Sequence, residues 1–323
     1  MKRYIKKFFI YFLFSITISG LCFFIYLKTY KPKIKPINSI EPVIDSADQE
    51  LDTELGPLEM AVKNSNNINF ILLGIENEPR SDVIVFLSFD PDDKKISMIS
   101  IPRDTYYYEK GYEKGDQRKL NAVFGRSGAL GTADAIGEIL AGVPIHHYIC
   151  MKYQTVADIV DILGGVEIDI PFHMDYIDPS DNPPLIIDIP KGRQKLNGEQ
   201  ALKFLRWRQN NDKKIGYPDG DLGRIRAQQK FIKEAIKKSL NSSLPTVIEK
   251  VFSDVGTNMT QIEALSYCVK AMEIKVDDIA LLLLPGMPEY QKIDDVRWSY
   301  YFYDKDKVRD MMLGIYGVEI QKP

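Results

Sequence analysis

Three short runs of almost uninterrupted apolar residues constrain the fold of this chain more than any other feature. They are INFILLGI at 68–75, VIVFLSF at 83–89 and ISMISIP at 96–102. A strand with one face in water alternates apolar and polar residues, whereas a strand covered on both faces is apolar throughout. These runs therefore predict a sheet that has helices on both faces.

The rest of the chain alternates between helical patterns and strand-like runs, which predicts an α/β domain over residues 67–323. Thr132 is expected to cap a helix, and Thr260 with Glu263 forms a capping box. VEIDIP and LIIDIP are expected as strands around a polar, proline-rich hairpin. Expected helices cover 120–124, 132–140, 155–163, 221–240, 245–255, 260–272 and 308–314, and other expected strands lie near 148–151, 280–284 and 298–303.

Residues Phe8–Leu27 form a run of twenty positions without a charged side chain. That length matches the hydrocarbon thickness of a bilayer for one helix. The alternative is a secretory signal peptide, but the basic sequence KTYKPKIKP follows instead of a small-residue cleavage site. We therefore expect an uncleaved transmembrane anchor, with residues 1–7 as a short cytoplasmic tail.

Residues 28–66 are expected to form an extracytoplasmic linker, because four prolines break it and its charge changes from basic to acidic. A short helix is expected near 51–62. Such a tether holds the domain near the membrane without fixing its orientation. The net charge of −3 gives no support for a nucleic-acid partner.

Four arginines lie in two short runs between residues 197 and 229, with apolar residues between them. Asn197 and Gln200 indicate a capped helix start. In a continuing helix, Arg206 and Arg208 would point roughly 200° apart. If the helix ends near residue 205 and the chain extends, both lie on one face with Trp207 behind them.

A second helix is expected to begin at Asp221, which places Arg224 and Gln228 on one face of its first turns. Arg224 then joins Arg206 and Arg208 in an anion-binding site, because the N–H groups of a helix N-terminus also favour negative charge. Arg226 is expected to face away. The alternative for these arginines is surface salt bridges.

Two acidic residues flank the ends of the first two strands: Glu76 follows the first and Asp82 precedes the second. Sequential strands are commonly neighbours, so both carboxylates are predicted to face one crevice. Few hard oxygen ligands suit Mg²⁺, which also takes phosphate oxygens. Arg103 follows the third strand and reaches the same edge. The alternative is that these loop carboxylates pair with Arg80.

Seven motifs occur in order along the chain and resemble the LytR-CpsA-Psr family of cell-envelope proteins. They are ILLGIE, RSDVIV, SMISIPRDTY, KLNAVFG, ILGGVEIDIP, KGRQKLNGEQALKFLRWR and DLGRIRAQQ. The resemblance implies an α-β-α sandwich with a central mixed sheet, located outside the cytoplasm behind one N-terminal transmembrane helix. It also implies transfer of an anionic glycopolymer, such as teichoic acid or capsule, from a polyprenyl-pyrophosphate carrier to peptidoglycan with Mg²⁺.

Matched to the family's motifs, Asp82 falls on a metal-binding carboxylate, and Glu76 stands where the family usually has aspartate. The pyrophosphate-binding and catalytic positions fall on Arg103, Arg206, Arg208, Arg224 and Gln228. Ala227 replaces a usual arginine. The lipid is expected between the sheet and helices near 135–140 and 156–163, although the same residues would serve as plain core.

Three functions remain open from the sequence. The first is a glycopolymer transferase, and the second is a hydrolase that cleaves the same lipid pyrophosphate with water. The third is a non-catalytic lipid-binding or regulatory membrane protein, which the carboxylate pair disfavours because binding alone needs no metal pair.

Overall fold

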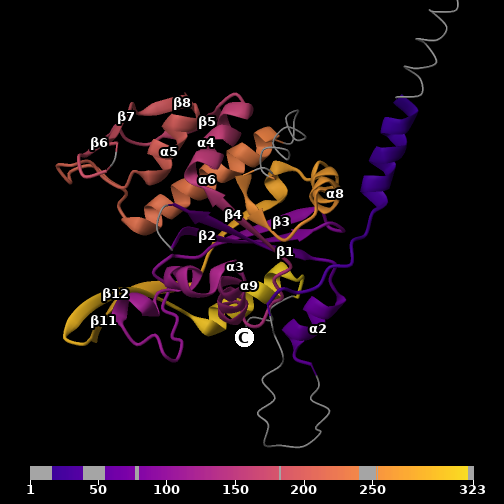
Figure 1. The fold of residues 1–323 in the computed structure, drawn as a ribbon, viewed down its shortest axis with the longest axis horizontal. Helices are drawn as coiled ribbons and strands as arrows, with labels where there is room; N and C mark the ends of the chain where they lie inside the picture. The colour runs from indigo at the N-terminus through magenta and orange to yellow at the C-terminus, as the bar shows by residue number, and fades with distance from the viewer. Residues whose placement is uncertain are drawn as a thin grey trace, which may run out of the picture.

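The computed structural model describes residues 17–38, 55–76, 80–181, 183–239, 252 and 254–318. A six-stranded mixed sheet forms the centre of the molecule, in the order β10-β3-β2-β1-β4-β9 (Figure 1). The pairs β1–β4 and β3–β10 are parallel and the other pairs are antiparallel. The strands are β1 (Ile68–Ile75), β2 (Ser81–Asp90), β3 (Lys95–Ser100), β4 (His147–Lys152), β9 (Gly256–Thr257) and β10 (Ile279–Leu283).

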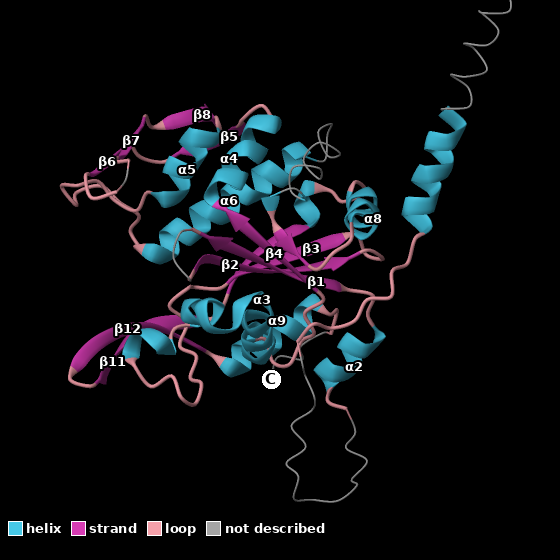
Figure 2. Ribbon diagram, in the orientation of Figure 1, coloured by secondary structure: helices cyan, strands magenta, loops and turns pink. Residues whose placement is uncertain are grey.

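Helices cover both faces of this sheet (Figure 2). One face carries α2 (Pro57–Asn64), α3 (Leu120–Ile139) and α9 (Lys305–Ile315). The other carries α4 (Tyr153–Ile162), α5 (Gly198–Arg206), α6 (Asp221–Ser239) and α8 (Gln261–Ala271). The expected α/β sandwich with a covered mixed sheet is therefore confirmed. Two short 3₁₀ helices lie at Gly115–Arg118 and Val276–Asp278.

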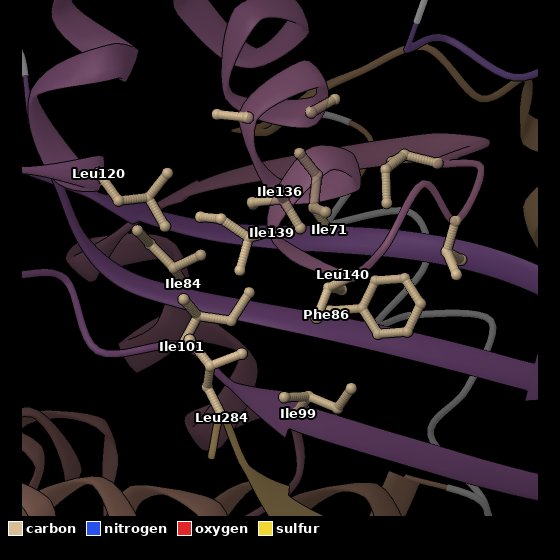
Figure 3. Packing of buried hydrophobic residues seen from close by; sticks show 14 of the residues in the cluster. Ile71, Ile84, Phe86, Ile99, Ile101, Leu120, Ile136, Ile139, Leu140 and Leu284 are labelled. Atoms are coloured by element: carbon tan, nitrogen blue, oxygen red, sulfur yellow. The ribbon is translucent and has the colours of Figure 1, made fainter. Parts of the chain in front are cut away.

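Successive side chains of β1 enter different cores, as the two-residue period of a strand requires. Ile71 and Leu73 are fully buried against α3 and α9, in the cluster that Figure 3 shows. Phe70 and Leu72 point to the opposite face, where they pack beneath α8 and α6. This two-sided burial explains why the strand is apolar throughout.

Three two-stranded ribbons lie outside the central sheet. The strands β5 (Val166–Ile170) and β8 (Gly192–Leu196) pair with each other, as do β6 (Met174–Asp178) and β7 (Leu185–Ile189). Together with α4, α5 and α6 they enclose a second core around Trp207 and Phe231. The third ribbon, β11 (Gly286–Ile293) with β12 (Val296–Tyr303), projects from the molecule (Figure 1).

VEIDIP and LIIDIP form strands β5 and β7, as expected, and they pair with β8 and β6 and not with each other. One local expectation is wrong. Thr132 caps no helix, since α3 runs through it with a break only at Gly128 (φ 62°). The Thr132 hydroxyl instead donates to the Gly128 carbonyl at 2.7 Å. Both predicted capping boxes, at Asn197 and Thr260, are confirmed.

The N-terminal segment is described from residue 17, where a helix runs to residue 29. Among the described residues, none of the helices has the length and apolar character required to cross a bilayer. Residues 30–38 then pack along the domain, with Asn38 buried, instead of standing free as a tether. Residues 1–16, 39–54 and most of the helix expected at 245–255 lie outside the described residues.

Gly198→Ala should destabilise the protein. The added Cβ would overlap the backbone carbonyl oxygen of Ala157 in α4, while the Gly198 N–H already donates to Asp161 Oδ1 at 2.8 Å. Overpacking of this kind costs about 1–3 kcal/mol. Urea unfolding should show that loss for Gly198→Ala, whereas Glu199→Ala at the next, exposed position should change the midpoint little. Equal stability of the two variants would show that α4 moves away freely.

Candidate active site

An apolar cavity of about 340 Å³ lies between the central sheet and helices α4, α5 and α6. Its floor is formed by Leu72 and Val83 of the sheet. Its walls are formed by Met151 of β4 and by apolar side chains of the three helices. These are Val156, Ile159 and Val160 of α4, Leu202 and Leu205 of α5, and Phe231, Ile232, Ala235 and Ile236 of α6. Polar side chains gather at one end, and they are Glu76, Asp82, Arg103, Tyr153, Arg206, Arg224 and Gln228. The cavity is thus amphiphilic.

Helix α6 supplies both the polar and the apolar part of this lining. Residues 224, 228, 231, 232, 235 and 236 share one helical face, because they are spaced by three and four. The first two are Arg224 and Gln228, and the others are apolar. Reading this stripe beyond residue 228 would have identified the apolar wall from the sequence.

The end of α5 places Arg206 in the cavity. The helix begins at the Asn197 capping box and ends at Arg206, after which Trp207 is extended (φ −66°, ψ 139°). Trp207 is only 1% exposed and packs edge-on against Tyr217. The expected change from helix to extended chain with Trp207 behind is therefore confirmed.

Arg208 does not line the cavity with Arg206, although they were expected on one face. Its side chain is 45% exposed and pairs with Asp221 Oδ1 at 2.9 Å. Asp221 starts α6 as predicted, and the same oxygen forms an ion pair with Arg224 Nη2 at 2.8 Å. Arg208 therefore reaches the site through Asp221.

Arg224 is the most buried of the cavity arginines. Its side chain is 14% exposed, and burial lowers its pKa. The charges of Arg208 and Arg103 lower this pKa as well, whereas the charge of Asp221 raises it. Within the described part of the chain, its Nε and that of Arg103 have no hydrogen-bond partner. Buried donors left unpaired are costly, so an incoming anion would be favoured here. Gln228 donates to the Leu205 carbonyl at 3.0 Å.

Arg226 faces away from the cavity, as predicted. It is exposed and pairs with Asp219 in the loop before α6. The loop residue Arg80 pairs with Asp116 at 3.0 Å, and not with the two carboxylates at the cavity.

The two predicted carboxylates meet at the polar end of the cavity. Asp82 Oδ1 accepts from Arg103 Nη1 at 2.5 Å. Burial raises the pKa of Glu76. The positive charge of Arg206 lowers this pKa, and the negative charges of Asp181 and Asp82 raise it. Asp82 and Glu76 both line this end of the cavity.

Two further residues belong to the site and were not predicted. Tyr153, the first residue of α4, donates its hydroxyl to Asp82 Oδ2 at 3.4 Å, and burial raises its pKa. Asp181 lies in the β6–β7 connection and pairs with Arg206 at 2.7 Å. Nothing in the local sequence marks Asp181, because the contact depends on where the ribbon folds.

The described residues contain no group of three histidine, cysteine, aspartate or glutamate side chains that could hold a metal. Two carboxylates nevertheless fit Mg²⁺, which keeps several waters and completes its shell with substrate phosphate oxygens. The fit rests on the position of Glu76 and Asp82 in the lining of the same cavity.

Of the two helices expected to line a lipid pocket, one lines the cavity. Val156, Ile159 and Val160 of α4 line the cavity. Residues 135–140 lie on the opposite face of the sheet, where Ile136 and Leu140 are closed core (Figure 3). The sequence pattern was the same for both helices, and only the sheet decides which one meets the cavity.

The fold and the site define an α/β protein with an apolar cavity that opens at a cationic, carboxylate-bearing mouth. This chain belongs to the LytR_cpsA_psr family, which matches residues 28–313. It is 31% identical over 262 residues to the polyisoprenyl-teichoic acid–peptidoglycan teichoic acid transferase TagU of Bacillus anthracis, covering 76% of this chain and 77% of that protein.

The similarly named transferase TagV of Bacillus subtilis is 27% identical over 242 residues, which is 72% of this chain but only 60% of TagV. The crystal structure of B. subtilis TagV superposes with a TM-score of 0.64 at 26% identity, covering 80% of this chain and all of that one. The fold is therefore the one found in these relatives.

Arg206→Ala and Arg224→Ala should each weaken binding of a polyprenyl pyrophosphate about ten- to a hundredfold. A hydrogen bond to a charged group contributes about 1.5–3 kcal/mol, and 1.4 kcal/mol corresponds to tenfold. Arg208→Ala should weaken binding less, because Arg208 contacts the site through Asp221.

Arg226→Ala is the matched control, since an exposed pair contributes about 1 kcal/mol or less. Binding can be measured by calorimetry with each variant, after circular dichroism has confirmed folding. Equal losses at all four positions would contradict this assignment of the helix faces.

Proposed function

We propose that this protein is a Mg²⁺-dependent phosphotransferase. Its donor is an anionic glycopolymer carried on a polyprenyl pyrophosphate, and its acceptor is a hydroxyl group of peptidoglycan. The reaction joins the polymer to peptidoglycan by a phosphodiester and leaves the polyprenyl monophosphate.

The amphiphilic cavity is the observation that carries this proposal. A polyprenyl pyrophosphate has an apolar chain next to a multiply charged head. The cavity has a matching arrangement, with an apolar part next to a cationic end. The apolar walls of α4, α5 and α6 suit the chain, and Arg103, Arg206 and Arg224 suit the head. Guanidinium groups bind phosphate oxygens through paired N–H donors.

The names of the relatives support the same reaction class. TagU of B. anthracis and TagV of B. subtilis are both named as polyisoprenyl-teichoic acid–peptidoglycan teichoic acid transferases. Both names contain the polyisoprenyl carrier and the peptidoglycan acceptor of the proposed reaction.

In the proposed reaction the acceptor hydroxyl attacks the phosphorus that carries the glycopolymer. A new oxygen–phosphorus bond forms, the hydroxyl proton passes to solvent, the bond from that phosphorus to the bridging oxygen breaks, and the electron pair leaves with the polyprenyl phosphate. Positioning and charge neutralisation carry most of the catalysis of such transfers. Arg103, Arg206 and Arg224 would supply the positive charge where negative charge increases on the leaving phosphate.

Glu76 and Asp82 would hold Mg²⁺ at the mouth. When bound, the ion would neutralise charge on the pyrophosphate oxygens. Asp82 is oriented for this role by Arg103 and Tyr153, which contact its two carboxylate oxygens at 2.5 and 3.4 Å.

We place the protein at the outer face of the cell membrane, anchored by the apolar span at 8–27 with its N-terminus in the cytoplasm. A polyprenyl carrier is held in a bilayer, so an anchored enzyme meets its donor without a soluble intermediate. The observation that favours this location is the apolar helix at residues 17–29, whose side chains are exposed up to residue 26.

A reconstitution experiment distinguishes transfer from the other two functions. The full chain is incubated with a polyprenyl-pyrophosphoryl saccharide, Mg²⁺ and peptidoglycan, and the products are identified by mass spectrometry. We expect a phosphodiester-linked saccharide on the peptidoglycan, and a rate at least a hundredfold lower for Asp82→Asn, on the order of the loss when a charged catalytic group is removed.

Asp90→Asn serves as the control, because Asp90 lies at the far end of the same strand. Cleavage of the lipid without a linked product would identify a hydrolase instead. Full activity in excess EDTA would contradict the role of Mg²⁺.

Metal affinity should fall in mild acid. Glu76 has a raised pKa, so its proton is retained to a higher pH than in an ordinary glutamate, and the protonated form is a poor ligand. Mn²⁺ can replace Mg²⁺ as a probe, because its binding is measured by paramagnetic resonance. As the pH falls through the raised pKa of Glu76, the affinity of the site for Mn²⁺ should decrease. Glu76→Gln should bind Mn²⁺ weakly at every pH and lose this dependence. An unchanged pH profile in Glu76→Gln would exclude Glu76 as a ligand.

A further inference from the structure

The segment after the N-terminal helix is attached to the catalytic domain at both of its ends. At its start, the Ser266 hydroxyl of α8 donates to the Leu27 carbonyl at 2.9 Å, and Lys270 donates to the Tyr30 carbonyl at 2.8 Å. Leu27 itself is only 4% exposed. The helix at 17–29 therefore leaves the domain from a fixed point on α8.

At its other end the segment is held by Asn38. The Asn38 side chain donates to the Val143 carbonyl at 3.1 Å and accepts from the Ile145 N–H at 2.7 Å. The neighbouring Ile37 N–H donates to the Ile145 carbonyl at 2.7 Å. We refer to residues 30–38 as the strap.

The strap is extended and has two different sides. Ile34 is half-buried and packs against the core beneath α8, whereas Lys31, Lys33 and Lys35 are exposed. This alternation follows from the two-residue period of an extended chain. One side of the strap therefore binds the domain, and the other presents a row of positive charge.

The helix before the strap has apolar side chains facing solvent all around it. Ile18, Leu21, Phe23, Phe24 and Ile25 are between 44% and 60% exposed. In Figure 1 this helix stands away from the domain. A helix that is apolar on every side needs an apolar environment, which a bilayer supplies.

The cavity extends toward the same side of the molecule as the strap. Its lining runs along α6 from Arg224 to Ile236, about 18 Å at 1.5 Å per residue. Ile232 and Ile236, at the apolar end, pack against the cluster that also holds Tyr267 of α8 and Ile34 of the strap. The polar mouth lies at the opposite end of α6.

We propose that the strap and the adjoining surface of α8 rest on an anionic membrane surface and fix the orientation of the domain. The three strap lysines would contact anionic lipid head groups, each contributing favourable electrostatic energy. Glu273, an acidic side chain just beyond α8, is already paired with Lys28 and Lys94 at 2.5 and 2.8 Å. The apolar end of the cavity then faces the bilayer and the cationic mouth faces away from it.

This orientation deepens the proposed function, because it would place the apolar end of the cavity next to the membrane and the cationic mouth on the aqueous side. The orientation itself is measured without any reaction. Its failure would therefore leave the transferase proposal standing, and a failure of transfer would leave the orientation standing.

Fluorescence quenching by spin-labelled lipids tests the proposal on the full chain in vesicles that contain phosphatidylglycerol. A dye is attached through Met272→Cys at the end of α8, or through Ile177→Cys on the β6–β7 ribbon, where the side chains are 50% and 49% exposed. The background variant replaces the three natural cysteines with alanine. We expect strong quenching for Met272→Cys and little for Ile177→Cys. Equal quenching at the two sites would overturn the proposal.

Two strap variants show whether the strap sets the orientation. Asn38→Ala removes the attachment at one end, and a triple change of Lys31, Lys33 and Lys35 to glutamine removes the positive row. Each should reduce the difference in quenching between the two dye sites, whereas Asn64→Ala on the exposed end of α2 should preserve it. A difference that survives both strap variants would show that the strap does not orient the domain.

Discussion

The mouth of the cavity depends on the pairing of arginine with aspartate. A guanidinium at the edge of an apolar cavity loses hydration, and it is stable there only if an anion is nearby. Asp82 holds Arg103 and Asp181 holds Arg206, and each of these pairs joins two different segments of the chain, whereas Asp221 holds Arg224 within α6. A phosphate that enters the mouth must compete with these carboxylates.

The sorting of side chains in β1 links this site to the rest of the fold. Residues that point to one face complete the closed core beneath α3 and α9. Leu72, Gly74 and Glu76 point to the other face and form, in order, the floor of the cavity and its polar end. One strand therefore provides both stability and a binding surface, because its two faces meet different layers.

Local sequence patterns predicted those parts of the site that depend on neighbouring residues. The Asn197 capping box, the extended conformation at Trp207 and the start of α6 at Asp221 were each indicated by a few adjacent side chains. The opposite directions of Arg224 and Arg226 followed from helix geometry alone. Thr132 shows the limit of such patterns. A threonine can start a helix by capping it, but a threonine inside a helix can equally donate its hydroxyl to an earlier carbonyl.

The fold class, the family and most residues of the mouth could be predicted from the sequence, since apolar runs, capping signals and motif order are local properties of the chain. The structure was needed to show that Arg208 acts through Asp221, that Asp181 reaches Arg206, and that α4 lines the cavity while α3 does not. The same is true of the packing of residues 30–38 against the domain. These are contacts between distant segments, and no local pattern specifies which segments will meet.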